Sequence, residues 1–387
     1  MTEWMLMAAF ALAAFFSGRD AESRMICFVA CTTVVAGRAA TVGGRVIVGH
    51  NEDDNGCPDV RHGYVPPRSF APGAAMPAEA GHASVPQVER TLGFYWSEFK
   101  YVTKGGSSFC DSFVNEKGVL VCSNSARTEN ACDPDGLVDG GIGYNLRRAV
   151  AERAVSARNA VEVLTGLVSH WGYASPGRLY TVTDSREAWI VQVVFGRRSW
   201  VARRVPDDEV ALLPNCYTVR RLESGDVFPP ELEGRGTDFD FARTFQRESK
   251  WKAPVNQGRW RNLVRIFAGV EWPDDDYPFS VKPRNKVDEA LVRKALGTHF
   301  EGTEDEVPVG EDGTRHGESR FAPVCRRTTA ESAVYIFGEK PCDLRVARCK
   351  GPPCLGRYET VFPLANPTVD PTVVERLERH HLPDISG

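Results

Sequence analysis

The sequence has 387 residues, of which 42% are hydrophobic and 25% charged, and its 47 basic and 51 acidic side chains give a formal charge of −4 at pH 7. This composition is typical of a globular protein and excludes collagen-like, coiled-coil and broadly disordered classes. The length predicts about two to three domains or one large layered domain. The small negative charge gives no general attraction to nucleic acid or anionic membranes. The eleven cysteines are an odd number, so at least one thiol is expected to stay unpaired.

The N-terminal segment is expected to be a leader or propeptide over residues 1–30. Residues 5–16 form an apolar run of signal-peptide length that is too short to span a bilayer, for which about 20 residues are needed. The absence of Lys and Arg before this run argues against a signal peptide over 1–23, whereas the small residues in 21–23 suit its cleavage. A start at Met25 is another alternative. A signal peptide would make the protein secreted or extracytoplasmic, and otherwise it would be cytoplasmic.

The predicted elements form a block of strands, a block of helices and a second block of strands. Strands are expected in a β-branched run that begins at Cys31, and then over 45–49, 109–114, 118–122, 178–184, 188–194 and 199–203, with a last strand pair over 333–337 and 358–362. The first two strands form a hairpin. Helical spacing of apolar residues predicts a helical hairpin over 144–171 and short helices over 238–247 and 287–296. The Pro-, Gly- and Ala-rich segment 58–87 is expected to be a long loop. This order favours a layered α+β architecture.

Several motifs that carry well-defined chemistry are absent from the sequence. It contains no phosphate-binding loop, no Gly-x-Ser-x-Gly elbow and no His-Glu-x-x-His zinc pair. Asp133-Pro134-Asp135-Gly136 lacks the ligand spacing of a calcium-binding loop and is expected to be a solvated turn. Cys342, Cys349 and Cys354 form no Cys-x-x-Cys pair and have no histidine close in sequence, so they are expected to be disulfides or buried thiols. We therefore expect neither a metal nor a cofactor.

Cys31 and a group of acidic residues are the remaining candidates for chemistry. Asn51-Glu52-Asp53 end the second strand of the hairpin, so the carboxylates are expected to fold back beside Cys31. If the chain is cleaved after Ala30, Cys31 gains an α-amino group with a pKa of about 7.7 to 8, which suits a general base. Nucleophile and base then belong to one residue. Spacing alone favours the alternative, a buried strand cysteine beside a solvated turn.

Three short motifs resemble the start of the C69 dipeptidases: Cys31-Thr32-Thr33, residues 37–41 and Asn51-Glu52-Asp53. These dipeptidases are the dipeptidase A and secernin relatives among the N-terminal-nucleophile hydrolases. Further motifs resemble this family in the same order, at 115–119, 152–154, 184–190, 200–208, 214–215, 278–283 and 299–303. The resemblance covers the chain from Cys31 to about Asn366. It implies a four-layer αββα sandwich and one catalytic domain over 31–387.

The resemblance also implies roles for individual residues. Cys31 would be the nucleophile, Asp53 would orient and charge its freed α-amino group, and Asn215 would contribute to the oxyanion hole. Asn124 would supply a second contact. Arg320 would close the site, with a plain surface arginine as the alternative.

Two departures from the family pattern concern His50 and the C-terminus. His50, which precedes Asn51, stands where the dipeptidases carry Arg and secernins Lys; a neutral imidazole there would weaken the positive field that lowers the thiol pKa. His50 and Asn51 are both expected to support the site. The chain also ends soon after 358–363, where the dipeptidases continue with a further helical section.

The leading hypothesis is a cysteine dipeptidase that works through a thioester on Cys31, with a small peptide as its partner, no nucleic acid and no membrane span. A homo-oligomer is compatible with the sequence. Two alternatives stay open. One is an acylase on other linear amides, similar to bile-salt and penicillin V hydrolases, and the other is a non-catalytic, secernin-like binding protein.

Overall fold

A computed structural model describes residues 31–54, 59–77, 81–100, 108–128, 136–196, 199–236, 238–272, 276–317 and 321–378. The expected leader over 1–30, most of the expected turn at 133–136 and the candidate Arg320 lie outside the described residues.

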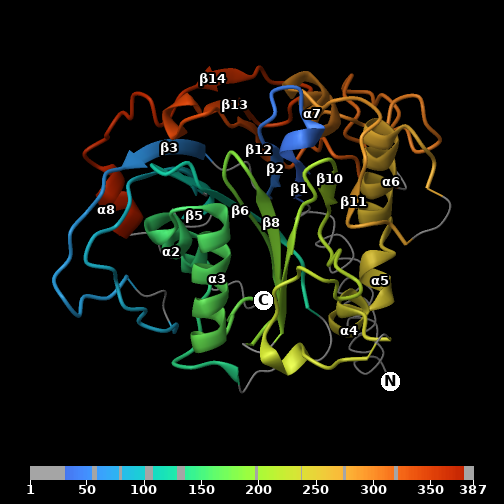
Figure 1. The fold of residues 1–387 in the computed structure, drawn as a ribbon. Coiled ribbons are helices and arrows are strands. Elements are labelled where there is room, and N and C mark those ends of the chain that lie inside the picture. Colours follow the sequence, from blue (N-terminus) through green and yellow to red (C-terminus); the bar gives the residue numbers. More distant parts are fainter. Residues whose placement is uncertain are drawn as a thin grey trace, which may run out of the picture.

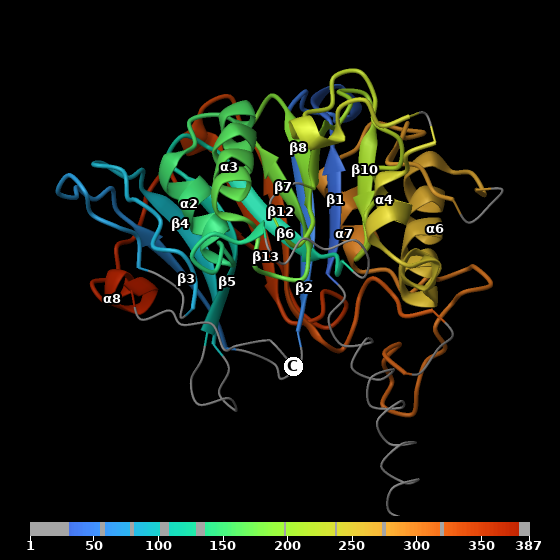
Figure 2. The same ribbon diagram turned by 90° about the horizontal axis from the view of Figure 1, so that it is seen from below.

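Two antiparallel sheets stack face to face between helices, and each sheet contains seven strands within the described part of the chain (Figures 1 and 2). The first sheet has the order β11 (Ser280–Val281), β10 (Val210–Leu213), β1 (Thr32–Ala36), β2 (Ile47–Asp53), β12 (Thr329–Ile336), β13 (Arg345–Lys350) and β14 (Glu359–Val361). The second sheet runs in chain order through β3 (Asp59–Val65), β4 (Phe94–Lys100), β5 (Ser108–Asn115), β6 (Leu120–Ser125), β7 (Arg178–Thr183), β8 (Ala188–Val193) and β9 (Trp200–Arg204).

Helices cover the outer face of each sheet. The second sheet is covered by α2 (Asn145–Arg153), α3 (Ala157–Trp171) and α8 (Val373–Glu378), and the first by α6 (Pro254–Ala268) and α7 (Glu289–Leu296), while α4 (Phe241–Phe245) and α5 (Glu248–Trp251) precede α6. Three buried hydrophobic clusters occupy the spaces between these layers: one under α2 and α3, one between the sheets and one under α6 and α7. The expected four-layer αββα sandwich is therefore confirmed.

Local sequence explains why the helical hairpin forms where it was expected. Ser156 caps α3 by accepting a hydrogen bond from the backbone N–H of Asn159, and Gly172 ends the helix with a φ of 80°. The buried face of α3 includes Val161, Leu164 and Val168, spaced three and four residues apart as an amphipathic helix requires.

The β1–β2 hairpin sets the two faces on which the polar residues lie. The strands pair antiparallel with Thr33 opposite His50. Because side chains alternate along a strand, His50 and Glu52 face the second sheet, whereas Asn51 and Asp53 face the helical layer of α6 and α7. The expected return of the acidic residues to the start of β1 is confirmed.

Several expectations about strands were wrong. β12 and β14 do not pair with each other, because β13 lies between them. The expected loop over 58–87 contains strand β3, which pairs along its whole length with β4. β4, β10 and helix α6 were not predicted. All of these elements are fixed by partners distant in sequence, which local patterns do not reveal.

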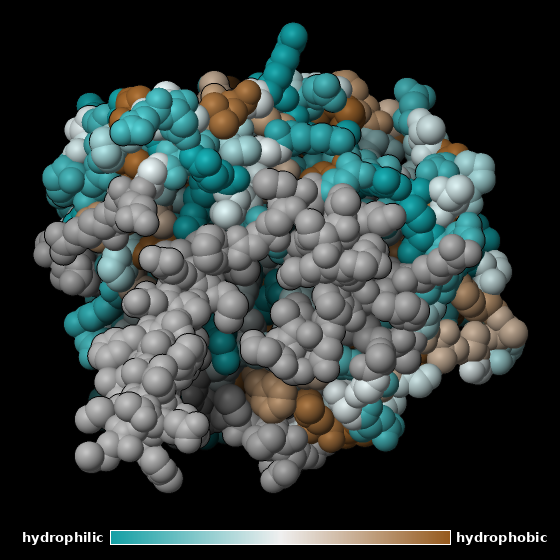
Figure 3. Space-filling model, turned by 180° about the vertical axis from the view of Figure 1, so that it is seen from behind, coloured by the Kyte–Doolittle hydropathy of each residue, from teal (hydrophilic) through white to brown (hydrophobic). Residues whose placement is uncertain are grey.

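The surface seen from behind is mostly hydrophilic where its residues are coloured, and the hydrophobic residues there form small separate patches (Figure 3). Such scattered apolar side chains are normal for a globular protein. None of the helices in the described ranges is long and apolar enough to cross a membrane.

Candidate active site

Cys31 lies directly before β1 and is held by three other elements. Its side chain is buried, and Sγ donates a hydrogen bond to Glu52 Oε2 on β2 at 3.2 Å. Its carbonyl oxygen accepts hydrogen bonds from Asn124 Nδ2 on β6 at 3.2 Å and from Arg259 Nη1 on α6 at 2.7 Å. The second sheet and the helical layer therefore both fix the position of this residue.

His50 lies at the centre of a buried acid–base cluster next to Cys31. Its Nε2 is 2.9 Å from Asp111 Oδ2 and 3.4 Å from Glu52 Oε2. Its Nδ1 is 2.7 Å from Thr33 Oγ1, whose hydroxyl donates to Asn124 Oδ1 at 2.5 Å. Because Thr33 uses its hydrogen on Asn124, it accepts one from Nδ1. Both ring nitrogens therefore face acceptors, which is the arrangement of an imidazolium.

The ionisation of this cluster differs from the expectation of a neutral His50. Burial disfavours the charged ring, but Asp111, Cys122 and Glu52 together outweigh it and raise the pKa of His50 well above its ordinary value. Burial likewise opposes the charge of Asp111, but His50, Arg147 and Ser112 together lower the pKa of Asp111 to about 2. Burial and the negative charge of Asp111 raise the pKa of Glu52 to about 7. His50 keeps the positive charge of the usual arginine, but Asp111 balances that charge.

The thiol of Cys31 is protonated in these surroundings. Burial raises its pKa well above the ordinary value, and the carboxylates of Glu52, Asp53 and Asp111 raise it further, while a hydrogen bond from the Asp53 backbone lowers it. A reactive thiolate at this position therefore needs an additional positive charge beside it.

Asp53 has one oxygen bound and one oxygen unpaired. Oδ1 accepts a hydrogen bond from Thr329 Oγ1 at 2.6 Å, whereas the buried Oδ2 has no hydrogen-bond partner among the described residues. Burial raises the pKa of Asp53 to about 6, although Arg326, Thr329 and Arg259 act in the opposite direction. An unpaired buried acceptor carries a free-energy penalty of about 1–3 kcal/mol unless a donor reaches it.

Arg259 is a site residue that the sequence did not reveal. Its buried guanidinium donates to the Cys31 carbonyl, to Thr32 Oγ1 at 2.9 Å, and to Asn215 Oδ1 and Asn256 Oδ1, each at 2.9 Å. Burial and the nearby Arg326 lower its pKa to about 10, so it remains charged at neutral pH. Helix α6 also contains other arginines and buries Asn256, Gln257 and Asn262, so the sequence around Arg259 carries no distinct signal.

The two candidate asparagines use their amide groups differently. Asn124 Nδ2 donates two hydrogen bonds inside the protein, one to the Cys31 carbonyl at 3.2 Å and one to the Leu213 carbonyl at 2.9 Å. Asn215 Nδ2 donates to the Ser125 carbonyl at 2.9 Å, the one acceptor that the described residues offer it. Asn215 therefore has a second N–H available for a ligand, whereas Asn124 positions Cys31.

Asn51 does not face Cys31. Its Nδ2 donates to the backbone carbonyls of Leu296 at 3.0 Å and Val324 at 3.1 Å, on the side of the helical layer. It thus ties the end of α7 and the segment before β12 to strand β2. Its contribution is structural support.

A pocket of about 450 Å³ lies at another part of the molecule, lined in part by Arg38, Asp184 and Lys340. Cys31 is not among its lining residues.

Two groups of side chains in the described part of the chain offer closely spaced metal ligands. His50, Glu52 and Asp111 form the first, and their ligand atoms lie within 4.8 Å of one another. In this group His50 Nε2 forms an ion pair with each carboxylate, although it has no hydrogen-bond partner among the described residues. The second group, near the C-terminus, includes Cys354, which is a free thiol, as are Cys342 and Cys349. The expected alternative of disulfides is not found among these cysteines.

Comparisons with known proteins place the chain among peptidases. Residues 30–342 match the profile of peptidase family C69. A probable dipeptidase of Salmonella dublin is 24% identical over 71% of this chain and 67% of its own length. A probable dipeptidase A of Streptococcus pyogenes serotype M3 is 25% identical over 82% of this chain and 72% of its own length.

Solved structures that superimpose on the chain do so at low identity. Penicillin V acylase from Agrobacterium tumefaciens gives a TM-score of 0.40 at 14% identity, covering 83% of this chain and 82% of that one. A mutant of conjugated bile acid hydrolase from Clostridium perfringens gives a TM-score of 0.41 at 10% identity, covering 86% of this chain and 96% of that one. The family assignment rests on the profile match over most of the sequence. The chain therefore belongs to peptidase family C69 and is a peptide-bond hydrolase.

Proposed function

We propose that the protein is a cysteine dipeptidase in which Cys31 becomes the N-terminal residue and acts as nucleophile. The observation that carries this proposal is the coincidence of two boundaries. The match to family C69 starts at residue 30, and the buried contacts from Glu52, Asn124 and Arg259 converge on the next residue. The curated relatives quoted above are named probable dipeptidases, which supports dipeptides as substrates.

Removal of residues 1–30 as a leader is the first step of this proposal, and it leaves 31–387 as one catalytic domain. The Cys31 thiol attacks the Ala30 carbonyl, so the peptide bond becomes a thioester and the α-amino group of Cys31 is released. Water then hydrolyses the thioester, which frees the leader as a carboxylate and regenerates the thiol.

The released α-amino group supplies the positive charge that is missing beside the Cys31 thiol. As an ammonium it can donate to Asp53 Oδ2, the buried oxygen without a partner among the described residues. A positive charge next to Cys31 counteracts the carboxylates that raise the pKa of its thiol. Cleavage thus gives the Cys31 thiol its own base for repeated attack on substrates.

Catalysis then uses the thiol and the α-amino group of Cys31 together. The neutral α-amine takes the thiol proton while Sγ attacks the carbonyl carbon of the dipeptide. The second N–H of Asn215 Nδ2 stabilises the oxyanion of the tetrahedral intermediate. Collapse breaks the C–N bond and the α-ammonium protonates the leaving amine, which leaves an acyl thioester on Cys31. A water molecule deprotonated by the α-amine hydrolyses this thioester and restores the thiol.

A substrate panel tests the proposal. Purified full-length wild type, Cys31→Ala and the control Cys342→Ser are assayed against dipeptides and N-acyl amides. Cys342 is exposed and its Sγ donates a weak hydrogen bond to Asp343, far in sequence from Cys31, which makes it a matched thiol control. We expect hydrolysis of dipeptides by wild type and Cys342→Ser and none by Cys31→Ala. Hydrolysis of N-acyl amides alone, or full activity of Cys31→Ala, would overturn the proposal.

A further inference from the structure

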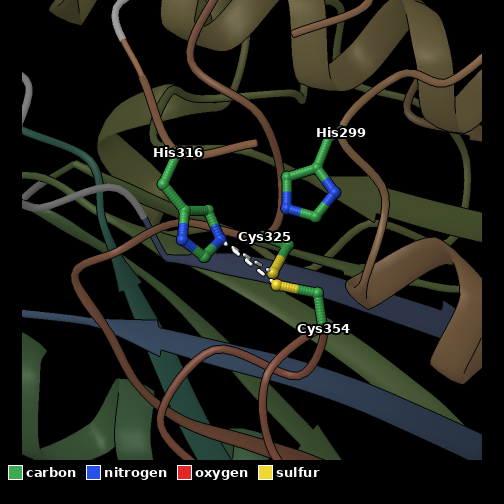
Figure 4. Close-up of side chains that lie close together, drawn as sticks. All are labelled: His299, His316, Cys325 and Cys354. Carbon is green, nitrogen blue, oxygen red and sulfur yellow. Dashed lines mark hydrogen bonds between the residues drawn. The ribbon is translucent and has the colours of Figure 1, made fainter. Parts of the chain in front are cut away.

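Four side chains from separate segments converge near the C-terminal part of the first sheet. His299 follows α7, His316 lies in the long connection to β12, Cys325 precedes β12, and Cys354 lies between β13 and β14. Their ligand atoms all lie within 4.8 Å of one another. Figure 4 shows both sulfur atoms and one ring nitrogen of each histidine directed toward one another.

We propose that His299, His316, Cys325 and Cys354 bind one structural zinc ion. The set of two imidazoles and two thiolates is a frequent ligand set of tetrahedral structural zinc, with all four positions filled by protein. Tetrahedral zinc with bonds of 2.0–2.3 Å needs ligand atoms about 3.3–3.8 Å apart. His316 Nε2 lies 3.3 Å from Cys354 Sγ and 3.6 Å from Cys325 Sγ, which matches that spacing.

The orientation of His299 is independent evidence for a ligand at this point. Its ring is buried and its Nδ1 is 2.9 Å from Glu301 Oε1, so Nδ1 carries the hydrogen. Its buried Nε2 has no hydrogen-bond partner among the described residues. A carboxylate that fixes the tautomer and orients the ring is the usual outer partner of a zinc-bound histidine. The lone pair of Nε2 is therefore available for a metal.

The chemistry of the ligands favours zinc over other ions. Thiolate and imidazole suit zinc, whereas magnesium and calcium require oxygen ligands. A Rieske iron–sulfur centre also uses two cysteines and two histidines, but it binds them to different irons. The short distances from His316 Nε2 to both sulfur atoms fit a single ion instead. Cys354 is exposed, which gives the ion a path into the site.

The proposed zinc would position a segment that contacts the candidate active site. Val324, next to Cys325, accepts the hydrogen bond from Asn51, and Thr329 donates to Asp53. The backbone N–H of Cys325 also donates to Thr298 at 3.1 Å, which joins the segments that carry the first and third ligands. Four covalent metal bonds would hold these connections together in a region with little regular structure.

Metal content is the direct test. The full-length chain is purified under reducing conditions without chelator, alongside Cys354→Ser, His299→Gln and the control Cys342→Ser, and zinc and iron are measured by elemental analysis. We expect about one zinc per chain in wild type and Cys342→Ser. Zinc should be lost from Cys354→Ser and His299→Gln. Zinc at wild-type content in both ligand variants, or iron in place of zinc, would overturn the proposal.

Two measurements on the wild type do not depend on how the variants fold. Reconstitution of the reduced apoprotein with cobalt should give the visible absorption of a tetrahedral site with thiolate charge-transfer bands. A chelator should lower the Tm of wild type and of Cys342→Ser. A chain that binds neither zinc nor cobalt after reconstitution, or that carries a Cys325–Cys354 disulfide when isolated under reducing conditions, would contradict a zinc site.

Discussion

Replacing Arg259 by lysine tests whether one buried guanidinium holds the candidate site together. The side chain makes at least five hydrogen bonds, two within its own helix, to Val255 and Asn256, and three to the Cys31 carbonyl, Thr32 and Asn215. A lysine ammonium has three N–H donors, so at least two of these bonds are lost. At about 1.5–3 kcal/mol for each hydrogen bond to a charged group, the free energy of unfolding should fall by about 3–6 kcal/mol.

Urea denaturation followed by tryptophan fluorescence measures this loss. Arg261→Lys is the matched control, because Arg261 lies on the same helix but its partner Asp305 is a single carboxylate and its own side chain is 25% exposed. Arg261 donates two hydrogen bonds to the buried Asp305, and lysine can keep one of them, so Arg261→Lys should lose about 1.5–3 kcal/mol. A loss for Arg259→Lys below about 1 kcal/mol, or no larger than for Arg261→Lys, would refute the reasoning.

Three further predictions concern other residues of the site. Burial raises the pKa of Glu52 from 4.5 to about 7, so the folded state binds this proton more tightly than the unfolded state, and this group makes stability fall as the pH rises through that window. Denaturation at several pH values should therefore show that the free energy of unfolding of Glu52→Gln rises by up to about 3 kcal/mol relative to that of wild type between pH 4.5 and 7. A difference in unfolding free energy that stays constant over this range would contradict the prediction. Asn51→Ala leaves two buried carbonyls without their donor, so its unfolding free energy should fall by about 2–6 kcal/mol, and a change under about 1 kcal/mol would refute the support role. Asn215→Ala should lower kcat for dipeptides about 100-fold or more with a smaller change in KM, and an unchanged kcat would exclude an oxyanion role.

Local patterns predicted the parts of the fold that depend on near neighbours in sequence. The β1–β2 hairpin follows from two β-branched runs separated by a glycine turn, and its register places Glu52 beside Cys31. The helical hairpin follows from its apolar spacing, and the structure adds the Ser156 cap at the start of α3. These elements needed no information about distant partners.

Long-range pairing set the rest of the fold. β2 pairs with β12, which places Asp53 opposite Thr329, and nothing in either segment specifies the other. β13 does not alternate regularly between polar and apolar residues and was missed, so β12 and β14 were wrongly paired with each other.

The site residues that sequence reasoning missed come from distant segments. Arg259 lies 228 residues from Cys31 in sequence, and Asp111 joins His50 from the other sheet. Cys354 was judged to lack a nearby histidine, yet His316, 38 residues away in sequence, lies beside it in space. Ligands separated in this way carry no local motif, and only the fold brings them together.

The mature N-terminus tests the central claim most directly. Intact-mass and N-terminal peptide mass spectrometry are applied to purified wild type and Cys31→Ala, each expressed as the full-length chain. The account predicts a wild-type chain that begins at Cys31 and a Cys31→Ala chain that retains Ala30. A wild-type protein that hydrolyses dipeptides while Ala30 remains attached to Cys31 would contradict it.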